Sequence, residues 1–173
     1  AEFRDLATAL SKTIKKTRRF TKAWPTSDGG NWNGLERLRE VLKLERPPAV
    51  IECFDISHVS GTFVVASMVR FISGKSDKRS YRRYKIKSFE GNDDFRSMEE
   101  VVGRRYGRLF QAGQEFPDLV VIDGGAGQVS SAMKAFADLE IDPPCLIGLA
   151  KREESIVFPD ERDELILDPR DAG

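Results

Sequence analysis

Two aspartates occur in or directly after short apolar segments that are typical of buried strands. Asp55 lies in the run IECFDI at 51–56, and Asp123 comes after the apolar residues 119–122 and before two glycines. A carboxylate that stays ionised and unpaired near a protein core is destabilising by several kcal/mol, so each needs a partner. For either residue alone a structural partner is sufficient, because Asp123 can cap the next helix and Asp55 can bond in a turn toward Ser57.

As a pair, the two aspartates predict a metal site. If their strands are parallel neighbours, Asp55 and Asp123 lie at one end of the sheet, within reach of a shared cation. Carboxylate oxygens suit Mg²⁺ or Mn²⁺, and a site of this kind activates water and stabilises the leaving oxygen of a phosphodiester. A further ligand is needed. Asp93 and Asp94 are candidates, although both can instead cap the helix that follows them.

Two neighbouring features bear on the same chemistry. His58, the only histidine, lies three residues after Asp55. Because 57–61 is predicted to be a turn, the direction of the His58 side chain is open. His58 can therefore have either a catalytic role or a positioning role. The second feature is a loop whose backbone N–H groups can cradle a phosphate, although such glycines are also common for steric reasons. It contains Gly124, Gly125, Gly127 and Gln128. It matches neither GxGxxG nor GxxxxGK[ST], so no nucleotide cofactor is expected.

The charge is locally polarised although the net charge is zero. Residues 75–87 hold seven basic side chains against Asp77 alone, and within them YRRYK at 81–85 interleaves rings with cations. On a strand, Tyr81, Arg83 and Lys85 share one face and Arg82, Tyr84 and Ile86 the other, and one of these faces can bind nucleic acid through phosphate contacts and stacking. The alternative is an edge strand kept soluble by charge. The acidic stretch 160–164 is predicted to be a solvated hairpin.

Length and composition restrict the class of protein. The chain has 173 residues, of which 40% are hydrophobic, enough for one domain with a real core. No apolar run approaches the roughly 18 residues of a membrane span, and the first twenty residues are not a secretory signal. Cys53 and Cys145 lie in apolar stretches, which indicates buried thiols in a reducing cytoplasm. Because the chain begins with Ala, we expect a piece of a longer protein.

The elements that position these residues follow from periodicity. An amphipathic helix at 3–20 and a linker at 25–34 form an N-terminal extension, and the domain proper is expected over 35–173. That domain begins with a short helix ended by two prolines, and its other elements are three β-rich runs at 49–56, 62–72 and 80–89, a helix over 98–110, a buried strand at 119–122, a helix over 129–139 and a buried strand at 145–149. The order is that of the ribonuclease H-like α/β fold, a mixed five-stranded sheet flanked by helices, with the first and fourth strands adjacent.

Five blocks in this order resemble a known family. They are IECFDISH at 51–58, DDFRSM at 93–98, RRY at 104–106, PDLVVIDGGAGQ at 117–128 and GLAKR at 148–152. From about residue 35 to 167 the chain resembles the C-terminal endonuclease domain of UvrC, the excinuclease subunit of nucleotide excision repair. The resemblance implies a Mg²⁺- or Mn²⁺-dependent domain that hydrolyses the damaged strand of double-stranded DNA on the 5′ side of the lesion. It also implies a cytoplasmic protein that works with UvrB in the UvrA/UvrB system, without membrane or nucleotide.

The resemblance also implies roles for individual residues. The metal aspartates of the family fall on Asp55 and Asp123, and its DD-aromatic-x-x-M aspartate falls on Asp94. From the basic residues themselves, apart from the resemblance, the expected DNA contacts are Tyr81, Arg82, Arg83, Lys85, Arg104, Arg105 and Lys151, although Lys151 can instead be a solvated strand end. The family completes its site with a histidine in a helix of the type RDEAHRF, and this chain ends before such a helix. We therefore expect weak or no cutting by the chain as it stands.

Two other functions were weighed against a nuclease. The first is a ribonuclease H-like module that binds DNA or repair partners without cutting, but the presence of Asp55 and Asp123 favours the nuclease. The second is a small-molecule phosphotransferase of the actin-like branch. Such an enzyme would need nucleotide loops that the sequence does not show.

Overall fold

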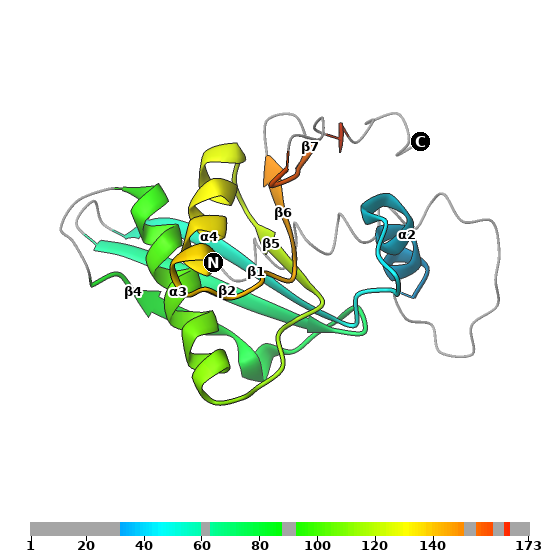
Figure 1. Cartoon of the computed structure of the whole chain (residues 1–173), viewed down its shortest axis with the longest axis horizontal. Coiled ribbons are helices and arrows are strands. Elements are labelled where there is room, and N and C mark those ends of the chain that lie inside the picture. Colours follow the sequence, from blue (N-terminus) through cyan, green and yellow to red (C-terminus); the bar gives the residue numbers. More distant parts are fainter. Residues whose placement is uncertain (1–31, 60–62, 88–92, 151–154, 161–164, 167–173) are drawn as a thin grey trace.

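The computed structural model describes residues 32–59, 63–87, 93–150, 155–160 and 165–166 (Figure 1). The helix expected at 3–20 lies outside the described residues. The first described helix is α2 (Trp32–Leu42), which begins inside the predicted linker. In the described part of the chain, no helix is long and apolar enough to cross a membrane.

Eight strands form one mixed sheet, and its centre has the predicted topology. The order is β3-β2-β1-β5-β6-β7-β8, with β4 also paired to β2. The strands β1, β2 and β4 are antiparallel neighbours, whereas β1, β5 and β6 run parallel. Their bounds are β1 (Val50–Val59), β2 (Phe63–Ile72), β3 (Lys75–Ser76), β4 (Arg82–Lys85), β5 (Leu119–Ile122), β6 (Cys145–Ala150), β7 (Ser155–Val157) and β8 (Leu165–Ile166).

This arrangement confirms the ribonuclease H-like fold class. The five predicted strands correspond to β1, β2, β4, β5 and β6, and the short strands β3, β7 and β8 extend the sheet. The antiparallel pair of β7 and β8 flanks the predicted acidic hairpin, whose residues 161–164 lie outside the described part.

Helices cover both faces of the sheet. Figure 1 shows α3 (Asp94–Gln111) and α4 (Ala126–Asp138) side by side on one face. Alternate strand residues, among them Phe54, pack beneath these two helices. Residues of the opposite parity, such as Ile51 and Cys53, pack against Leu35 of α2 on the other face. The sheet therefore has an α3/α4 face and an α2 face.

The two helices on the α3/α4 face begin earlier than predicted, at Asp94 and not at residue 98, and at Ala126 and not at residue 129. Asp93 is the N-cap of α3, and its carboxylate accepts the backbone N–H of Arg96 at 3.0 Å. Arg108 in the last turn complements the helix dipole. The ring of Tyr106 is fully buried and stacks on Phe136 of α4 with ring centres 4.9 Å apart, which joins α3 to α4.

Several predicted boundaries were wrong. The helix α2 begins within the predicted linker, and among its described residues the run predicted at 80–89 is a strand only over Arg82–Lys85. The stretch predicted as a turn from residue 57 belongs to β1 up to Val59, because Ser57, His58 and Val59 pair with Val65, Val64 and Phe63 of β2. In contrast, β5 pairs with β1 only from Ile51 to Phe54. Beyond that point β1 and β2 continue together past the end of β5 (Figure 1).

Candidate active site

Asp55 and Asp123 occupy adjacent positions on two parallel strands. The last register pair of β1 and β5 is Phe54 with Ile122, and the backbone N–H of Asp123 donates to the carbonyl of Phe54 at 2.9 Å. Asp55 is the next residue of β1, and Asp123 directly follows the last residue of β5. Strand alternation places Asp55 on the α2 face, on the side of Cys53, and the backbone bond to Phe54 places Asp123 next to it. The prediction that their strands are parallel neighbours is confirmed.

The row that contains the two aspartates continues across the sheet. Asp55 lies opposite Ser67 of β2, and Ser67 lies opposite Arg83 of β4. The side chain of Ser67 is fully buried, and its hydroxyl has no hydrogen-bond partner among the described residues. A row of two carboxylates, a hydroxyl and a guanidinium combines oxygen ligands for a cation with a donor for an anion.

These donors fit a hard divalent cation. Mg²⁺ is commonly held by one or two protein carboxylates together with water and substrate phosphate oxygens. Asp55 and Asp123 supply that number of carboxylates. Among the described residues, however, there is no group of three or more His, Cys, Asp or Glu side chains placed to hold a metal ion. A complete protein cage is therefore not built by this part of the chain.

Asp94 and His58 form a pair of their own. His58 Nε2 lies 2.9 Å from Asp94 Oδ1, and the two side chains are 37% and 42% exposed. His58 has the same parity as Phe54 in β1, so it lies on the α3/α4 face, opposite to Asp55. The hydrogen bond favours the positioning interpretation of His58. The predicted role of Asp94 as a third ligand stays a prediction.

The glycine-rich loop connects Asp123 to α4. Gly125 is the N-cap of α4 and provides no side-chain cap. A Cβ on Gly124 would collide with the side chain of Gln128, and a Cβ on Gly127 would lie 2.5 Å from the ring of Phe95. Close packing therefore accounts for these two glycines. A phosphate bound by the loop remains a prediction.

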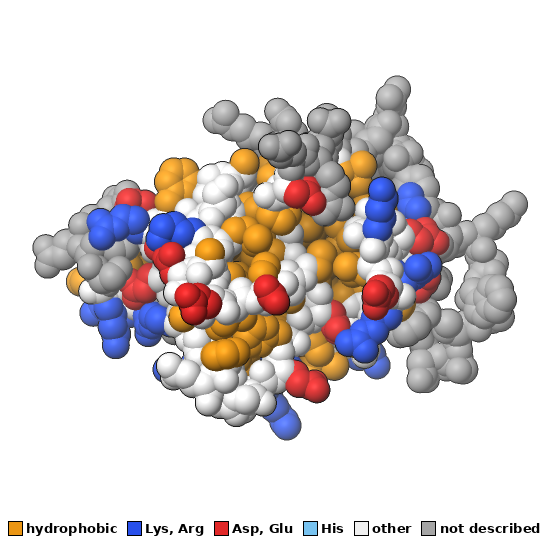
Figure 2. Space-filling model, viewed as in Figure 1, with side chains coloured by type: hydrophobic (Ala, Val, Ile, Leu, Met, Phe, Trp, Pro, Cys, Tyr) orange, Lys and Arg blue, Asp and Glu red, His pale blue; other side chains and the backbone are white. Residues whose placement is uncertain are grey.

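The basic residues of β4 divide between the two faces of the sheet. Arg83 and Lys85 lie on the α2 face, in the rows of Ser67 and Val65. Tyr81 packs at the same face, against the core beneath α2, as its predicted parity requires. Arg82 has the opposite parity, and its guanidinium donates to the carbonyls of Arg79 and Tyr81. Figure 2 shows Lys and Arg side chains, with acidic ones among them, around the end of the molecule where β4 lies.

The other predicted DNA contacts are bound within the protein or lie outside the described residues. Arg104 donates to the carbonyl of Lys85 at 2.8 Å and to Glu100 at 3.1 Å. Arg105 donates to Glu52 at 2.7 Å, and its side chain is only 14% exposed. Lys151 is outside the described part. For all three, contact with DNA is untested.

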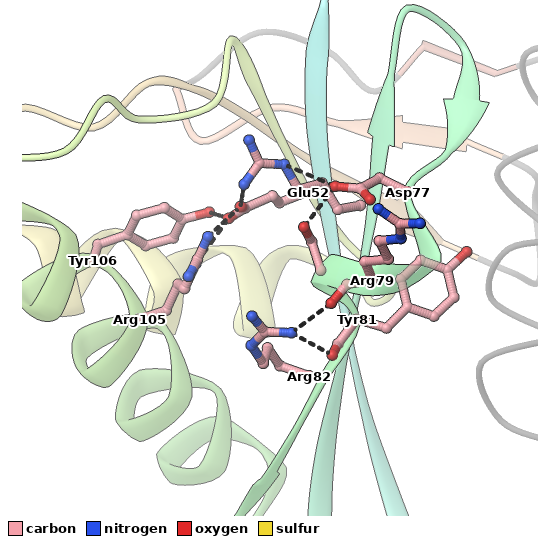
Figure 3. Close-up of polar contacts among 9 residues, drawn as sticks. Glu52, Asp77, Arg79, Tyr81, Arg82, Arg105 and Tyr106 are labelled. Atoms are coloured by element: carbon pink, nitrogen blue, oxygen red, sulfur yellow. Dashed lines mark hydrogen bonds and ion pairs between the residues drawn. The ribbon is translucent and has the colours of Figure 1, made fainter.

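Glu52 was missed by the sequence reasoning. Its carboxylate, 1% exposed, accepts the hydroxyl of Tyr106 at 2.8 Å as well as the guanidinium of Arg105 (Figure 3). Burial and the negative charge of Glu52 raise the pKa of Tyr106 well above its ordinary value. Burial works to lower the pKa of Arg105, but its hydrogen bond to Glu52 raises that pKa overall. The sequence does contain a signal for it: Glu52 is two residues before Phe54 in a strand, so both side chains face the same side of the sheet. This spacing predicts a buried carboxylate that needs partners.

Comparisons with known proteins identify relatives of this chain. Residues 39–173 match the family described as the UvrC RNase H endonuclease domain. The UvrABC system protein C of Methanosarcina mazei is 54% identical over 130 residues, which are 75% of this chain and 25% of that protein. The protein of the same name from Chlorobaculum tepidum is 51% identical over 129 residues, 75% of this chain and 20% of that protein. The chain thus spans about a quarter or less of these relatives.

Among solved structures, the chain is similar to a Ciona intestinalis endonuclease V in complex with DNA containing an inosine. The identity is 17% and the TM-score 0.43, with 86% of this chain and 58% of that chain covered. Human endonuclease V is similar at 14% identity and a TM-score of 0.40, covering 91% of this chain and 63% of that chain.

Proposed function

Because the chain belongs to the family of UvrC RNase H endonuclease domains, we propose that it is the domain of an excision-repair nuclease that cuts the damaged DNA strand on the 5′ side of the lesion. The observation that carries this proposal is the position of Asp55 and Asp123, next to each other at the point where β5 ends beside β1. Two carboxylates on a rigid sheet are a suitable platform for hydrolysis of a phosphodiester.

In this proposal Asp55 and Asp123 hold Mg²⁺ or Mn²⁺. When bound, the cation supplies Lewis-acid stabilisation of a phosphodiester and lowers the pKa of a water ligand. The side chains of the protein position the DNA strand. Arg83, in the row of Asp55 and Ser67, is placed to bind a phosphate oxygen of the strand that is cut.

The partners follow from the relatives and are also proposals. The similarity of this chain to proteins named UvrABC system protein C supports work with UvrA and UvrB on damaged double-stranded DNA. The basic side chains of β4 on the α2 face support a nucleic-acid substrate that runs across the sheet beside the two aspartates.

The proposal is tested by the metal affinity of the two aspartates. Asp55→Asn and Asp123→Asn are each titrated with Mn²⁺ by calorimetry, and Asp138→Asn on α4 is the matched control. We expect the first two to lose at least tenfold in affinity, because each removes a charged oxygen ligand. Both should fold at least as stably as the parent without metal, since two neighbouring carboxylates repel each other.

Nicking of a lesion-containing duplex, with the UvrA and UvrB proteins supplied, tests the reaction itself. The parent sequence and the three variants are compared, each both as this chain and within the full-length protein. Loss of the 5′ cut with Asp55→Asn and Asp123→Asn, but not with Asp138→Asn, supports the nuclease. Unchanged Mn²⁺ affinity in both site variants contradicts the proposed site, and binding of DNA without any cut favours a module that only docks.

A further inference from the structure

An exposed aromatic ring lies on the same sheet face as the two aspartates. Phe63 begins β2, and its side chain is 55% exposed. Within β2, Val64, Ala66 and Met68 are buried beneath α3 and α4. Strand alternation therefore places Phe63 on the α2 face, with Ser67. The sequence reasoning did not single out Phe63.

A cation accompanies this ring. The Nζ atom of Lys85 lies 5.2 Å from the centre of the Phe63 ring. Lys85 pairs with Val65, which in turn pairs with Ser57, so these three residues form the row next to that of Asp55 and Ser67. Successive rows on one face of a strand are about 6.5 Å apart. Lys85 thus lies one row beyond the proposed catalytic row, and Phe63, four residues before Ser67 in β2, lies two rows beyond it.

The environment of Phe63 differs from that of the other exposed phenylalanines. Phe110, 62% exposed, lies near the end of α3, and the ring of Phe95 covers Gly127. Single exposed apolar side chains are common and need no explanation by themselves. At Phe63, however, an exposed ring, an exposed lysine and the arginine of the next row share one face. Aromatic rings that stack on bases beside cations that bind phosphates are the means by which proteins hold single-stranded nucleic acid.

We propose that Phe63 stacks on an unpaired base of the DNA strand that is cut, while Lys85 binds a neighbouring phosphate. The contact fixes the strand along β2 and β4, so that a phosphodiester two rows from the stacked base lies over Asp55. This inference rests on the proposed function and adds to it the form of the substrate, a locally single-stranded segment. Phe63 acts as a positioning residue and takes no part in the chemical step.

The probe is a fluorescently labelled oligo(dT) strand, and binding is followed by anisotropy at several salt concentrations with Ca²⁺ in place of Mg²⁺. Phe63→Leu keeps an apolar side chain but removes the ring, and Phe110→Leu is the matched control. We expect Phe63→Leu to bind about ten- to one-hundredfold more weakly, the range of one lost base stack, with an unchanged salt slope. Phe63→Trp should bind at least as tightly as the parent. Lys85→Ala should flatten the slope of log K against log salt by about one.

An abasic strand of the same length separates stacking from charge. Phe63→Leu should bind it as the parent does, because no base is present to stack, whereas Lys85→Ala should still weaken it. Equal affinity of the parent and Phe63→Leu for oligo(dT) overturns the inference, as does a parent that has no affinity for a single strand. The Mn²⁺ titration of the aspartate variants is independent of these outcomes, so the inference can fail while the proposed nuclease site stands.

Discussion

At the scale of single residues, the buried carboxylate of Glu52 needs its hydrogen-bond partners more than an exposed carboxylate does. It is buried in β1 and bound by Arg105 and the hydroxyl of Tyr106, both from α3. Removal of one partner leaves a buried charge without full compensation, which is strongly destabilising even where the intact pair contributes little. The function of this cluster is therefore to join α3 to the strand that carries Asp55.

The first stability prediction concerns Arg105. Arg105→Ala should lower the free energy of unfolding by about 3 kcal/mol, because Glu52 then stays buried without its closest cation. Lys134→Ala is the control, and since Lys134 is 57% exposed and pairs with Glu99 and Asp138 at the surface, its loss should lower the free energy of unfolding much less. Urea unfolding of both variants measures the difference. Similar losses in the two variants would show that the buried pair of Glu52 and Arg105 contributes no more to stability than an exposed ion pair.

A second residue-scale prediction concerns alkaline pH. The pKa of Tyr106 is raised by burial and by the charge of Glu52. In the unfolded chain a tyrosine ionises near pH 10, so above that pH the unfolded state releases a proton that the folded state keeps. The contribution of Tyr106 is therefore fully present below about pH 10 and is lost as the pH rises toward the folded-state pKa. The slope is at most about 1.4 kcal/mol per pH unit.

Tyr106→Phe removes the ionising group, so its free energy of unfolding should fall less steeply between about pH 10 and 11 than that of the parent. At pH 8 the variant should be less stable by about 1 to 3 kcal/mol, because Glu52 loses a hydrogen-bond donor. Urea unfolding at a series of pH values checks both effects. Tyr84, whose pKa is also raised by burial, is present in both proteins and does not affect the comparison. Parallel pH profiles would contradict the assignment to Tyr106.

At the scale of elements, the sequence predicted the sheet centre because its signals are local. The apolar run 119–122 and the alternation before Asp55 are visible without any knowledge of partners, and short connections favour antiparallel neighbours. The extension of β1 to Val59 was missed because Gly61 and the serines around it are typical of a turn, while the pairing with β2 is a tertiary contact. The strands β3, β7 and β8 have too few residues to form a pattern.

The candidate site was also predictable only where it depends on local signals. The adjacency of Asp55 and Asp123 follows from the prediction that their strands are parallel neighbours, although Asp55 lies within β1 and not at its end. In contrast, Glu52 and Arg105 are 53 residues apart, and only the packing of α3 on β1 brings them together. The pair of His58 and Asp94 has the same origin, because its geometry depends on where β1 ends relative to the first turn of α3.

An element-scale prediction concerns the packing of β6 under the loop before α4. A Cβ on Gly148 would lie 2.7 Å from the carbonyl oxygen of Gly124 and 2.6 Å from Val129, and backbone cannot yield as a flexible side chain can. Gly148→Ala should therefore lower the free energy of unfolding by about 1 to 3 kcal/mol. In the control Gly103→Ala, the new Cβ meets only Ala135 at 3.9 Å, and the higher helix propensity should stabilise α3 by up to about 1 kcal/mol. Chemical unfolding measures both, and effects of equal sign would contradict the packing argument.

At the scale of the whole molecule, the two faces of the sheet have different tasks. The α3/α4 face holds the larger core, whereas the α2 face is covered by a helix at one end and carries Asp55, Asp123 and Arg83 at the other. A substrate that reaches the aspartates must therefore approach the α2 face. The basic residues of β4 should contribute to DNA binding according to the face on which they lie.

Salt dependence tests this division between the faces. Arg83→Ala should flatten the slope of log K against log salt by about one, because one phosphate contact with its released counterion is lost. Arg82→Ala should leave the slope unchanged, since Arg82 lies on the α3/α4 face and its guanidinium donates to the backbone carbonyls of Arg79 and Tyr81. Fluorescence anisotropy with a duplex probe provides the slopes. A flattened slope in Arg82→Ala would show that DNA crosses the edge of β4 and contacts both faces.

The continuation of β1 and β2 past the end of β5 has a consequence for motion. From Asp55 onward β1 is hydrogen-bonded to β2 alone, whereas from Ile51 to Phe54 it is held on both sides. Amide protons of β1 in the segment from Asp55 to Val59 should therefore exchange with solvent faster than those from Ile51 to Phe54. The proposed catalytic row lies where these two segments meet: Asp55 is the first residue beyond the slowly exchanging centre, and Phe63 pairs with Val59 at the far end of the segment, which can bend toward a distorted strand and become protected when it binds.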